Sequence, residues 1–306
     1  MGIDKEYTFL LHHSSVNIAR WEREAGPAAA ALVEPLKEKF FTGKSLVFYH
    51  EITGDRNVRR TIASGALLSY DKIKAQDGKV EGSHTIAKNT VHNIFNNIRM
   101  AEDVYKNSVY FRLLAGDQSK RNVGEGVYLS HDSMPEKAWF NFWDPGYIDR
   151  FDVEDAMFSP TVSGGFNYED VFVGGHIEDA LVLQAMRYLA YARCISTRNP
   201  EKYKTPKKVL EAFEKCGSAS FRRSLLCDEN PDMVELEAKY LGSKKFQDHF
   251  SRALTFVLAD VAQVGQVTLP VRVDVRDAVL AYQGSRRTVR EWQKDQGALL
   301  VIPELA

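Results

Sequence analysis

The fold is best predicted from one short stretch, Phe48-Tyr49-His50-Glu51-Ile52-Thr53. It closes a compact apolar run, and short apolar runs bounded by turn residues are typical of buried strands. The segment 57–64 then places Val58 and Ile62 at helical spacing, and Gly65 stands where a helix is commonly capped. We therefore predict a buried strand that ends in an imidazole and leads into a helix.

A second stretch, Gly124-Glu125-Gly126-Val127-Tyr128-Leu129-Ser130, predicts a turn that enters another strand. Trp139 follows Tyr128 by 139 − 128 = 11 positions. A strand-end His and two aromatic rings suggest a pocket for a flat, cationic ring beside a sugar. The two glycines alone are a weak signal, because the third Gly and the following helix of a dinucleotide fingerprint are missing.

These stretches resemble the His-Tyr type of ADP-ribosyltransferase, the group that contains diphtheria toxin and the poly-ADP-ribose polymerases. In that family a strand ends in Tyr-His-Gly-Thr and runs into a helix that finishes near a Gly, which is the layout of 49–65 here. The second family motif is Gly-x-Gly-Ile/Val-Tyr, which 124–128 match. The resemblance covers 44–142 and 267–306, and it does not cover the segment between them.

The resemblance implies that the substrate is NAD. His50 would bind the adenosine-side ribose, and the peptide of Glu51 would pair its N–H and C=O with the nicotinamide carboxamide. Tyr128 and Trp139 would enclose the pyridinium. Each good contact between the cationic ring and an aromatic face contributes roughly 0.5–2 kcal/mol to the binding free energy.

Three more positions of the motif region are candidate NAD-binding residues. Thr53 and Gly126 belong to the two motifs themselves. Arg59 could contact the pyrophosphate, since Arg forms bidentate contacts with phosphate, but a solvated helix face explains it equally well. No group of residues in the sequence has the spacing of a metal site.

The third catalytic position of the family is a Glu before a final apolar strand. If 298–302 is that strand, Gln296 takes the position here. Gln can hold a ribose hydroxyl, but it cannot act as a base. Asp295, Glu291 and Glu304 are the alternatives, and the sequence leaves the choice open.

Two further departures from the family concern the first motif. Glu51 replaces a Gly that lets the ligand approach the backbone closely. The interval from His50 to Tyr128 is 128 − 50 = 78 positions, about twice that of the best-known members, so 71–120 would be an insertion. Loop length alone costs little free energy.

Composition narrows the class of protein. The chain has 306 residues, is 44% hydrophobic and carries a net charge of −1, so no basic excess points to nucleic acid. No apolar run approaches the roughly 18 residues of a membrane span, and the N-terminus lacks the features of a signal peptide. Three Cys without metal-ligand spacing favour a reducing compartment. We expect a cytoplasmic protein, or one delivered into a host cell without a cleaved signal.

The predicted fold is α+β, with a split, twisted, mostly antiparallel NAD-binding sheet and a large helical insertion. We expect an N-terminal helical segment over 1–43, a core formed by 44–165 and 263–306, and a helical lobe over 166–262 that recognises the target. Inside these ranges, 134–142 predicts a short aromatic helix. Alternation over 266–275 predicts one strand.

The function expected from the resemblance is mono-ADP-ribosylation of a protein side chain, with release of nicotinamide. A bacterial effector or toxin that modifies a host protein would fit, and ubiquitin is one guess at the target. The alternatives on the same fold are ADP-ribosylation of nucleic acid and hydrolysis of NAD. A catalytically inactive module that binds NAD or a partner is the rival from another class.

Overall fold

The computed structural model describes a defined part of the chain, and the text below concerns that part. The described residues are 3–41, 46–69, 72–73, 75, 109–115, 124–130, 138–142, 171–215, 236–264, 266–269 and 272–296. The predicted final strand at 298–302, Glu304, and most of the predicted insertion at 71–120 lie outside them.

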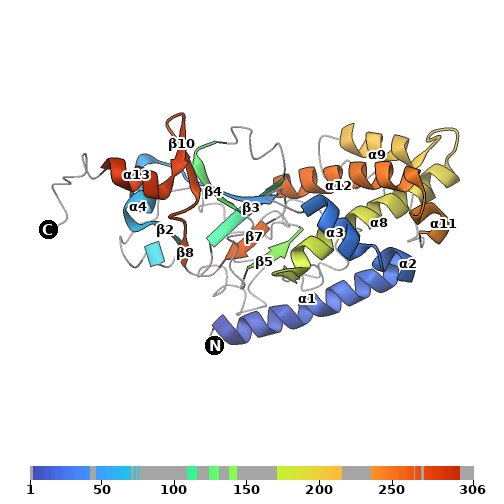
Figure 1. Cartoon of the computed structure of the whole chain (residues 1–306), viewed down its shortest axis with the longest axis horizontal. Helices are drawn as coiled ribbons and strands as arrows, with labels where there is room; N and C mark the ends of the chain where they lie inside the picture. The colour runs from blue at the N-terminus through green and yellow to red at the C-terminus, as the bar shows by residue number, and fades with distance from the viewer. Residues whose placement is uncertain are drawn as a thin grey trace, which may run out of the picture.

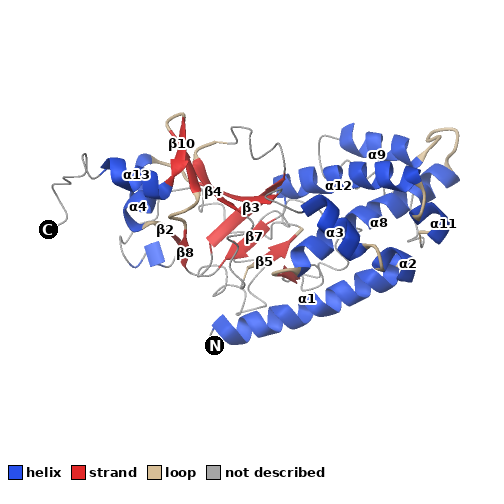
Figure 2. Ribbon diagram, in the orientation of Figure 1, coloured by secondary structure: helices blue, strands red, loops and turns tan. Residues whose placement is uncertain are grey.

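Helices and an antiparallel sheet make up the molecule, which confirms the α+β class (Figures 1 and 2). Within the described residues, eight strands form one sheet in the order β10-β9-β4-β1-β3-β7-β5-β6. Their bounds are β1 (Leu46–Glu51), β3 (Val109–Ala115), β4 (Gly126–Ser130), β5 (Trp139–Asn141), β6 (Val171–Val173), β7 (Gln266–Leu269), β9 (Val279–Tyr282) and β10 (Ser285–Thr288). A second sheet pairs β2 (Ala66–Leu68) with β8 (Arg272–Asp274).

The helices gather at the two ends of the sheet (Figure 1). One group comprises α1 (Ile3–Ala25), α2 (Pro27–Ala30), α3 (Val33–Phe41), α8 (His176–Arg198), α9 (Pro206–Lys215), α11 (Ala238–Leu241) and α12 (Lys244–Val264). At the other end, α4 (Asp55–Ser64) packs on α13 (Val289–Gln296). None of the described helices is long and apolar enough to cross a bilayer.

The main core lies on one face of the sheet. Phe48, Val127 and Leu280 lie on the same face of β1, β4 and β9 and are fully buried. Helix α12 packs against β3 and against α8, whose residues between Ile177 and Ile195 are almost all buried. The predicted helical lobe thus has α8 as its central helix, while β6, which also falls in 166–262, belongs to the sheet.

Helix α1 covers the edge of the sheet at β6. The side-chain amide of Asn17 donates to the carbonyl of Val171 (3.1 Å), and the hydroxyl of Ser14 accepts from the N–H of Val173 (2.9 Å). These side chains take the place of a further strand. An edge that would otherwise expose unpaired peptide groups is therefore closed.

The predicted strand and helix of the first motif are confirmed. The strand is β1, and the helix after it is α4, which ends at Gly65 in the left-handed conformation (φ 62°). The predicted helix over 134–142 is wrong for its described part, because Trp139–Asn141 is strand β5. Its alternating burial, with Phe140 inside the core, is a strand pattern that the aromatic content obscured.

The segment predicted as one strand, 266–275, is two strands in different sheets. Strand β7 pairs with β3 and β5, whereas β8 pairs with β2. Pro270 stands in the sequence between them, and a Pro cannot donate to a ladder. After β8, strands β9 and β10 form a hairpin whose two turn residues, Gln283 (φ 48°) and Gly284 (φ 75°), both have the positive φ that tight hairpins need.

Candidate functional site

The two motifs are brought together by direct pairing of β1 with β4. Tyr49 lies opposite Tyr128, and His50 lies opposite Val127. Successive side chains of a strand point to opposite faces, so His50 shares its face with Val127 and the core, whereas Tyr128 shares the other face with Tyr49. The expectation that His50 and Tyr128 line one pocket is therefore wrong, because the sheet itself separates them.

The two glycines of the second motif make room for Tyr49. A Cβ at Gly126 would collide with the carbonyl oxygen of His50 and would lie 2.7 Å from Tyr49 Cε2. Gly124 adopts φ +134°, and a Cβ there would lie 3.0 Å from the Tyr49 hydroxyl. Burial raises the pKa of Tyr49, and its hydroxyl donates to the carbonyl of Glu125 (3.2 Å). Gly126 thus has a packing role, and its expected contact with the cofactor stays a prediction.

Three described neighbours, Tyr49, Gly124 and Arg286, hold the side chain of Tyr128 in place. Its ring centroid lies 4.9 Å from that of Tyr49, and its hydroxyl donates to the carbonyl of Gly124 (3.3 Å). The guanidinium of Arg286, on β10, lies 4.4 Å from the ring centroid. The cation beside this ring is therefore an arginine of the chain itself, and Tyr128 is 5% exposed.

Trp139 lies in another part of the sheet. The order β4-β1-β3-β7-β5 puts four strand spacings between it and Tyr128, about 19 Å at about 4.8 Å each. Trp139 packs instead with Leu10 of α1 and with Val171 and Val173 of β6. Two rings that enclose a third must each lie within about 7 Å of it, so the predicted pair of Tyr128 and Trp139 is wrong.

The sheet splits beside His50. Strand β3 pairs with β1 only through Arg112–Ala115 and with β7 through Val109–Phe111. The N–H of Ile52 donates to the carbonyl of Glu125 (3.2 Å), and peptide groups alternate between the two sides of a strand. The peptide groups of Glu51 therefore point to the side of β1 on which β3 lies. The last residue pair of the β1–β3 ladder is Tyr49 with Arg112, so Glu51 lies beyond its end. Within the described residues, the peptide groups of Glu51 have no ladder partner on this side.

His50 is fixed at the point of the split. Its Nδ1 lies 2.7 Å from the carbonyl oxygen of Tyr110, and its ring packs 5.5 Å from that of Phe111. A carbonyl oxygen can only accept, so Nδ1 carries the hydrogen of this bond. The tautomer is thereby set, and Nε2 is the nitrogen that would accept from a hydroxyl in the neutral form.

A polar network joins the loops at the same end of β1, β4 and β9, and we call it the loop-edge network. Asp55 accepts from the Tyr282 hydroxyl (2.8 Å), which in turn accepts from the Gln283 side-chain amide (2.9 Å). The backbone N–H of Gln283 donates to the carboxylate of Glu125 (3.0 Å). The bond to Asp55, followed by burial, raises the pKa of Tyr282. Two exposed carboxylates thus lie around one tyrosine.

Two other predicted residues lie close to this network. The carbonyl of Thr53 accepts from the side-chain amide of Asn57 (2.8 Å), so it helps to start α4. Arg59 is exposed on α4, and its charge lowers the pKa of Tyr282, against the larger effect of Asp55. Arg59 therefore lies within electrostatic range of the Tyr282 hydroxyl.

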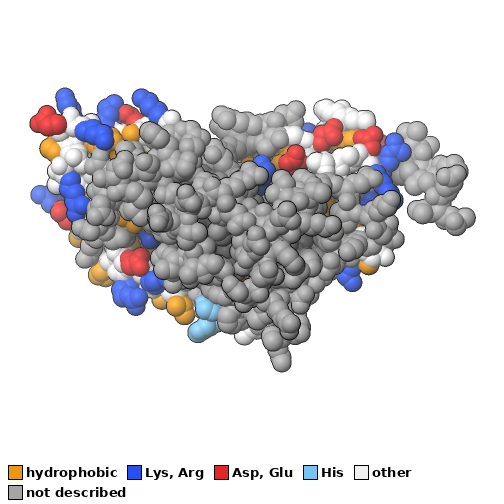
Figure 3. Space-filling model, turned by 180° about the vertical axis from the view of Figure 1, so that it is seen from behind, with side chains coloured by type: hydrophobic (Ala, Val, Ile, Leu, Met, Phe, Trp, Pro, Cys, Tyr) orange, Lys and Arg blue, Asp and Glu red, His pale blue; other side chains and the backbone are white. Residues whose placement is uncertain are grey.

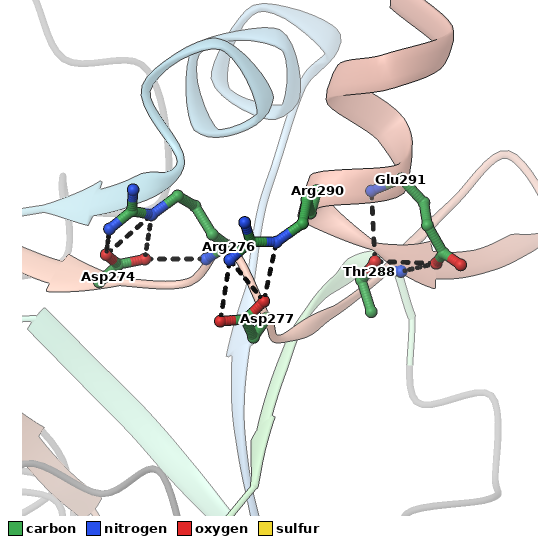
Figure 4. Close-up of polar contacts among 6 residues, drawn as sticks. All are labelled: Asp274, Arg276, Asp277, Thr288, Arg290 and Glu291. Atoms are coloured by element: carbon green, nitrogen blue, oxygen red, sulfur yellow. Dashed lines mark hydrogen bonds and ion pairs between the residues drawn. The ribbon is translucent and has the colours of Figure 1, made fainter.

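Three of the candidates for the third position, Glu291, Asp295 and Gln296, lie on α13, whereas Glu304 lies outside the described residues. Gln296 is the last residue of this helix, and the predicted strand at 298–302 lies outside the described residues. Asp295 forms an ion pair with Arg287. Glu291 accepts from the N–H (2.7 Å) and the hydroxyl (2.8 Å) of Thr288, whose hydroxyl accepts from the N–H of Glu291 (3.2 Å) (Figure 4). This reciprocal pair is a capping box, so Glu291 has a structural role at the helix start.

The same corner is held by two more ion pairs. Arg276 pairs with Asp274, and Arg290 of α13 pairs with Asp277 (2.9 Å) (Figure 4). Asp277 thus holds α13 against the turn after β8, while Asp274 pairs within that turn. The carboxylates that β1, β4 and β9 bring together are Glu125 and Asp55, which the sequence did not single out.

Glu125 could have been noticed from its place inside the second motif. Asp55 and Tyr282 carried no such signal, because they are 282 − 55 = 227 positions apart and meet only through the order of strands.

A search of curated proteins finds no match for this chain, and no protein-family model matches it either.

Proposed function

We propose that the chain transfers ADP-ribose from NAD to a protein side chain, with the reaction at the split beside His50. The observation that carries this proposal is the end of the β1–β3 ladder at Tyr49. It leaves the peptide edge of Glu51 without a ladder partner among the described residues, next to an imidazole of set tautomer. A carboxamide is complementary to such an edge, because it offers one acceptor and two donors.

The roles that we propose for the residues follow from this placement. Glu51 pairs its peptide groups with the nicotinamide carboxamide, and Nε2 of His50 accepts from a ribose hydroxyl. The bond between nicotinamide and ribose breaks, nicotinamide leaves with the electron pair, and the acceptor forms the new bond while it loses a proton. The ribose gains positive charge in this step, as in other glycosidic chemistry.

A carboxylate is needed to stabilise that charge, and we assign this role to Glu125. Its carbonyl accepts from the N–H of Ile52, the residue after Glu51, so its backbone lies on the β4 side of β1, one strand from the open peptide edge. Its carboxylate lies against the turn that follows Tyr282, whose side chain shares the face of His50. A carboxylate placed where positive charge develops is a large term in catalysis.

Release of nicotinamide from labelled NAD tests the proposal, with a lysate added as the source of acceptor proteins. We expect His50→Ala to slow turnover about tenfold or more, which corresponds to one hydrogen bond. Glu125→Gln should slow it by about 100-fold. Trp139→Phe is the matched aromatic control, and its turnover should equal that of the unchanged chain.

Label on a protein band supports transfer to a protein, whereas free nicotinamide without a labelled band supports hydrolysis. Equal turnover in His50→Ala and the unchanged chain would overturn the site.

A second candidate, a module that binds NAD without splitting it, is favoured by the buried, arginine-covered ring of Tyr128. It predicts heat of NAD binding in calorimetry with no nicotinamide released.

A further inference from the structure

A surface of the helical end carries exposed lysines, and we call it the lysine face. Its members are Lys204, Lys207, Lys239, Lys244 and Lys245. Blue side chains gather at the left of Figure 3, the end where α9, α11 and α12 lie when Figure 1 is turned round. Within the described residues these five lysines have no ion pair, whereas Lys208 beside them pairs with Glu211.

The positive charges converge on one place between four helices. The pKa of His249 is lowered mainly by burial. The charges of Arg193 on α8, Lys245 on α12 and Lys207 on α9 lower it further, whereas the charge of Asp248 raises it. His249 Nδ1 lies 2.8 Å from the Tyr240 hydroxyl of α11. Arg193 lies 3.8 Å from the Tyr240 ring centroid and 4.0 Å from a carboxylate oxygen of Glu237, with which it pairs. Residues from distant parts of the chain therefore build one cationic surface.

Three of the five lysines are not placed to stabilise their own helices. Lys207 lies in the first turn of α9, and Lys244 and Lys245 lie in the first turn of α12; neither turn holds an acidic residue. A helix start carries partial positive charge, so cations there are unfavourable and anions are favourable. Helix formation does not account for this arrangement, whereas attraction of an external anion does.

We propose that the lysine face binds an acidic segment of a partner protein. Complementary charge steers such an encounter and fixes its register. A protein fits better than nucleic acid because exposed carboxylates of Glu201, Glu237 and Asp248 lie among the lysines. These would repel a continuous row of phosphates, whereas a protein can place acidic and neutral side chains separately. This inference does not depend on the proposed reaction.

Fluorescence anisotropy with a labelled peptide of about 20 glutamates tests this surface on the full chain. We expect binding that weakens steeply as salt rises from about 50 to about 200 mM, as the Debye length shortens. The double variant Lys207→Glu with Lys245→Glu should bind at least about tenfold more weakly, since like charges repel across an interface. Lys72→Glu with Lys294→Glu, an equal change of charge outside the helical end, is the matched control and should keep the affinity.

Two outcomes would overturn the proposal. One is equal weakening in both double variants, which would show that only net charge matters. The other is tighter binding of a single-stranded oligonucleotide of equal charge than of the glutamate peptide, which would assign the surface to nucleic acid. All four substituted lysines are exposed, so the thermal unfolding midpoint should stay unchanged, and its measurement separates lost binding from lost folding.

Discussion

Tyr128 and Trp139 are close in sequence but lie in different parts of the sheet. Tyr128 is central, between Tyr49 and Arg286, on a strand paired on both sides. Trp139 is near the opposite edge, where α1 closes the sheet. The comparison teaches that spacing along a chain predicts a shared pocket only if the order of strands is known. An antiparallel sheet with crossovers can insert other strands between neighbours in sequence.

The largest expected effect tests the central region, through Gly126→Ala. The new Cβ would meet the His50 carbonyl and the Tyr49 ring, so we expect a loss of about 3 kcal/mol in the free energy of unfolding. Urea denaturation measures it. Gly175→Ala is the matched control, because nothing lies within 4 Å of its Cβ position, and its loss should stay below about 1 kcal/mol. Equal losses at both sites would contradict the seating of Tyr49 on these glycines.

The edge region is tested by Trp139→Ala. Trp139 is half-buried against α1 and β6, so we expect a loss of about 2 kcal/mol, below the range for a fully buried Trp. Turnover of NAD per folded molecule should be unchanged, since the ring is about four strand spacings from Tyr128. Turnover that falls with Trp139 while stability is kept would restore the original pairing of the two rings.

The smallest expected effect extends the comparison to the third catalytic position. Glu291→Gln keeps the shape of the side chain but weakens the capping box, for a loss of about 0.5–1 kcal/mol. Turnover should not change if Glu125 supplies the carboxylate. A fall in turnover of about 100-fold, with Glu125→Gln nearly as active as the unchanged chain, would instead place the catalytic carboxylate on α13.

Local parts of the fold could be predicted from the sequence, and their arrangement could not. The strand at His50 and the helix capped by Gly65 follow from apolar spacing and a C-cap glycine, which are local signals. The β9–β10 hairpin was missed because its turn is Gln283-Gly284, and Gln rarely adopts positive φ. The capping box of Thr288 and Glu291 has the pattern T-x-x-E, and it could have been found.

The candidate site was predictable only at its first motif. The sequence placed His50 and Glu51 at a strand end, and the structure places them where β3 departs from β1. The face on which each side chain lies depends on register, and a shift of one residue reverses it. The register therefore decides that Tyr128 and His50 lie on opposite faces, which the sequence alone does not show. The packing of the Tyr49 ring against Gly124 and Gly126 likewise depends on register and could not be predicted.

The most direct test follows the backbone amides of the chain while nicotinamide, and then NAD, is added. A ¹H–¹⁵N correlation spectrum resolves the Glu51 amide, and the indole N–H of Trp139 serves as the internal reference. The account predicts a saturable shift at Glu51 with no shift at Trp139, because the carboxamide binds the open peptide edge beside His50. A shift at Trp139 with none at Glu51, or no shift at either, would contradict it.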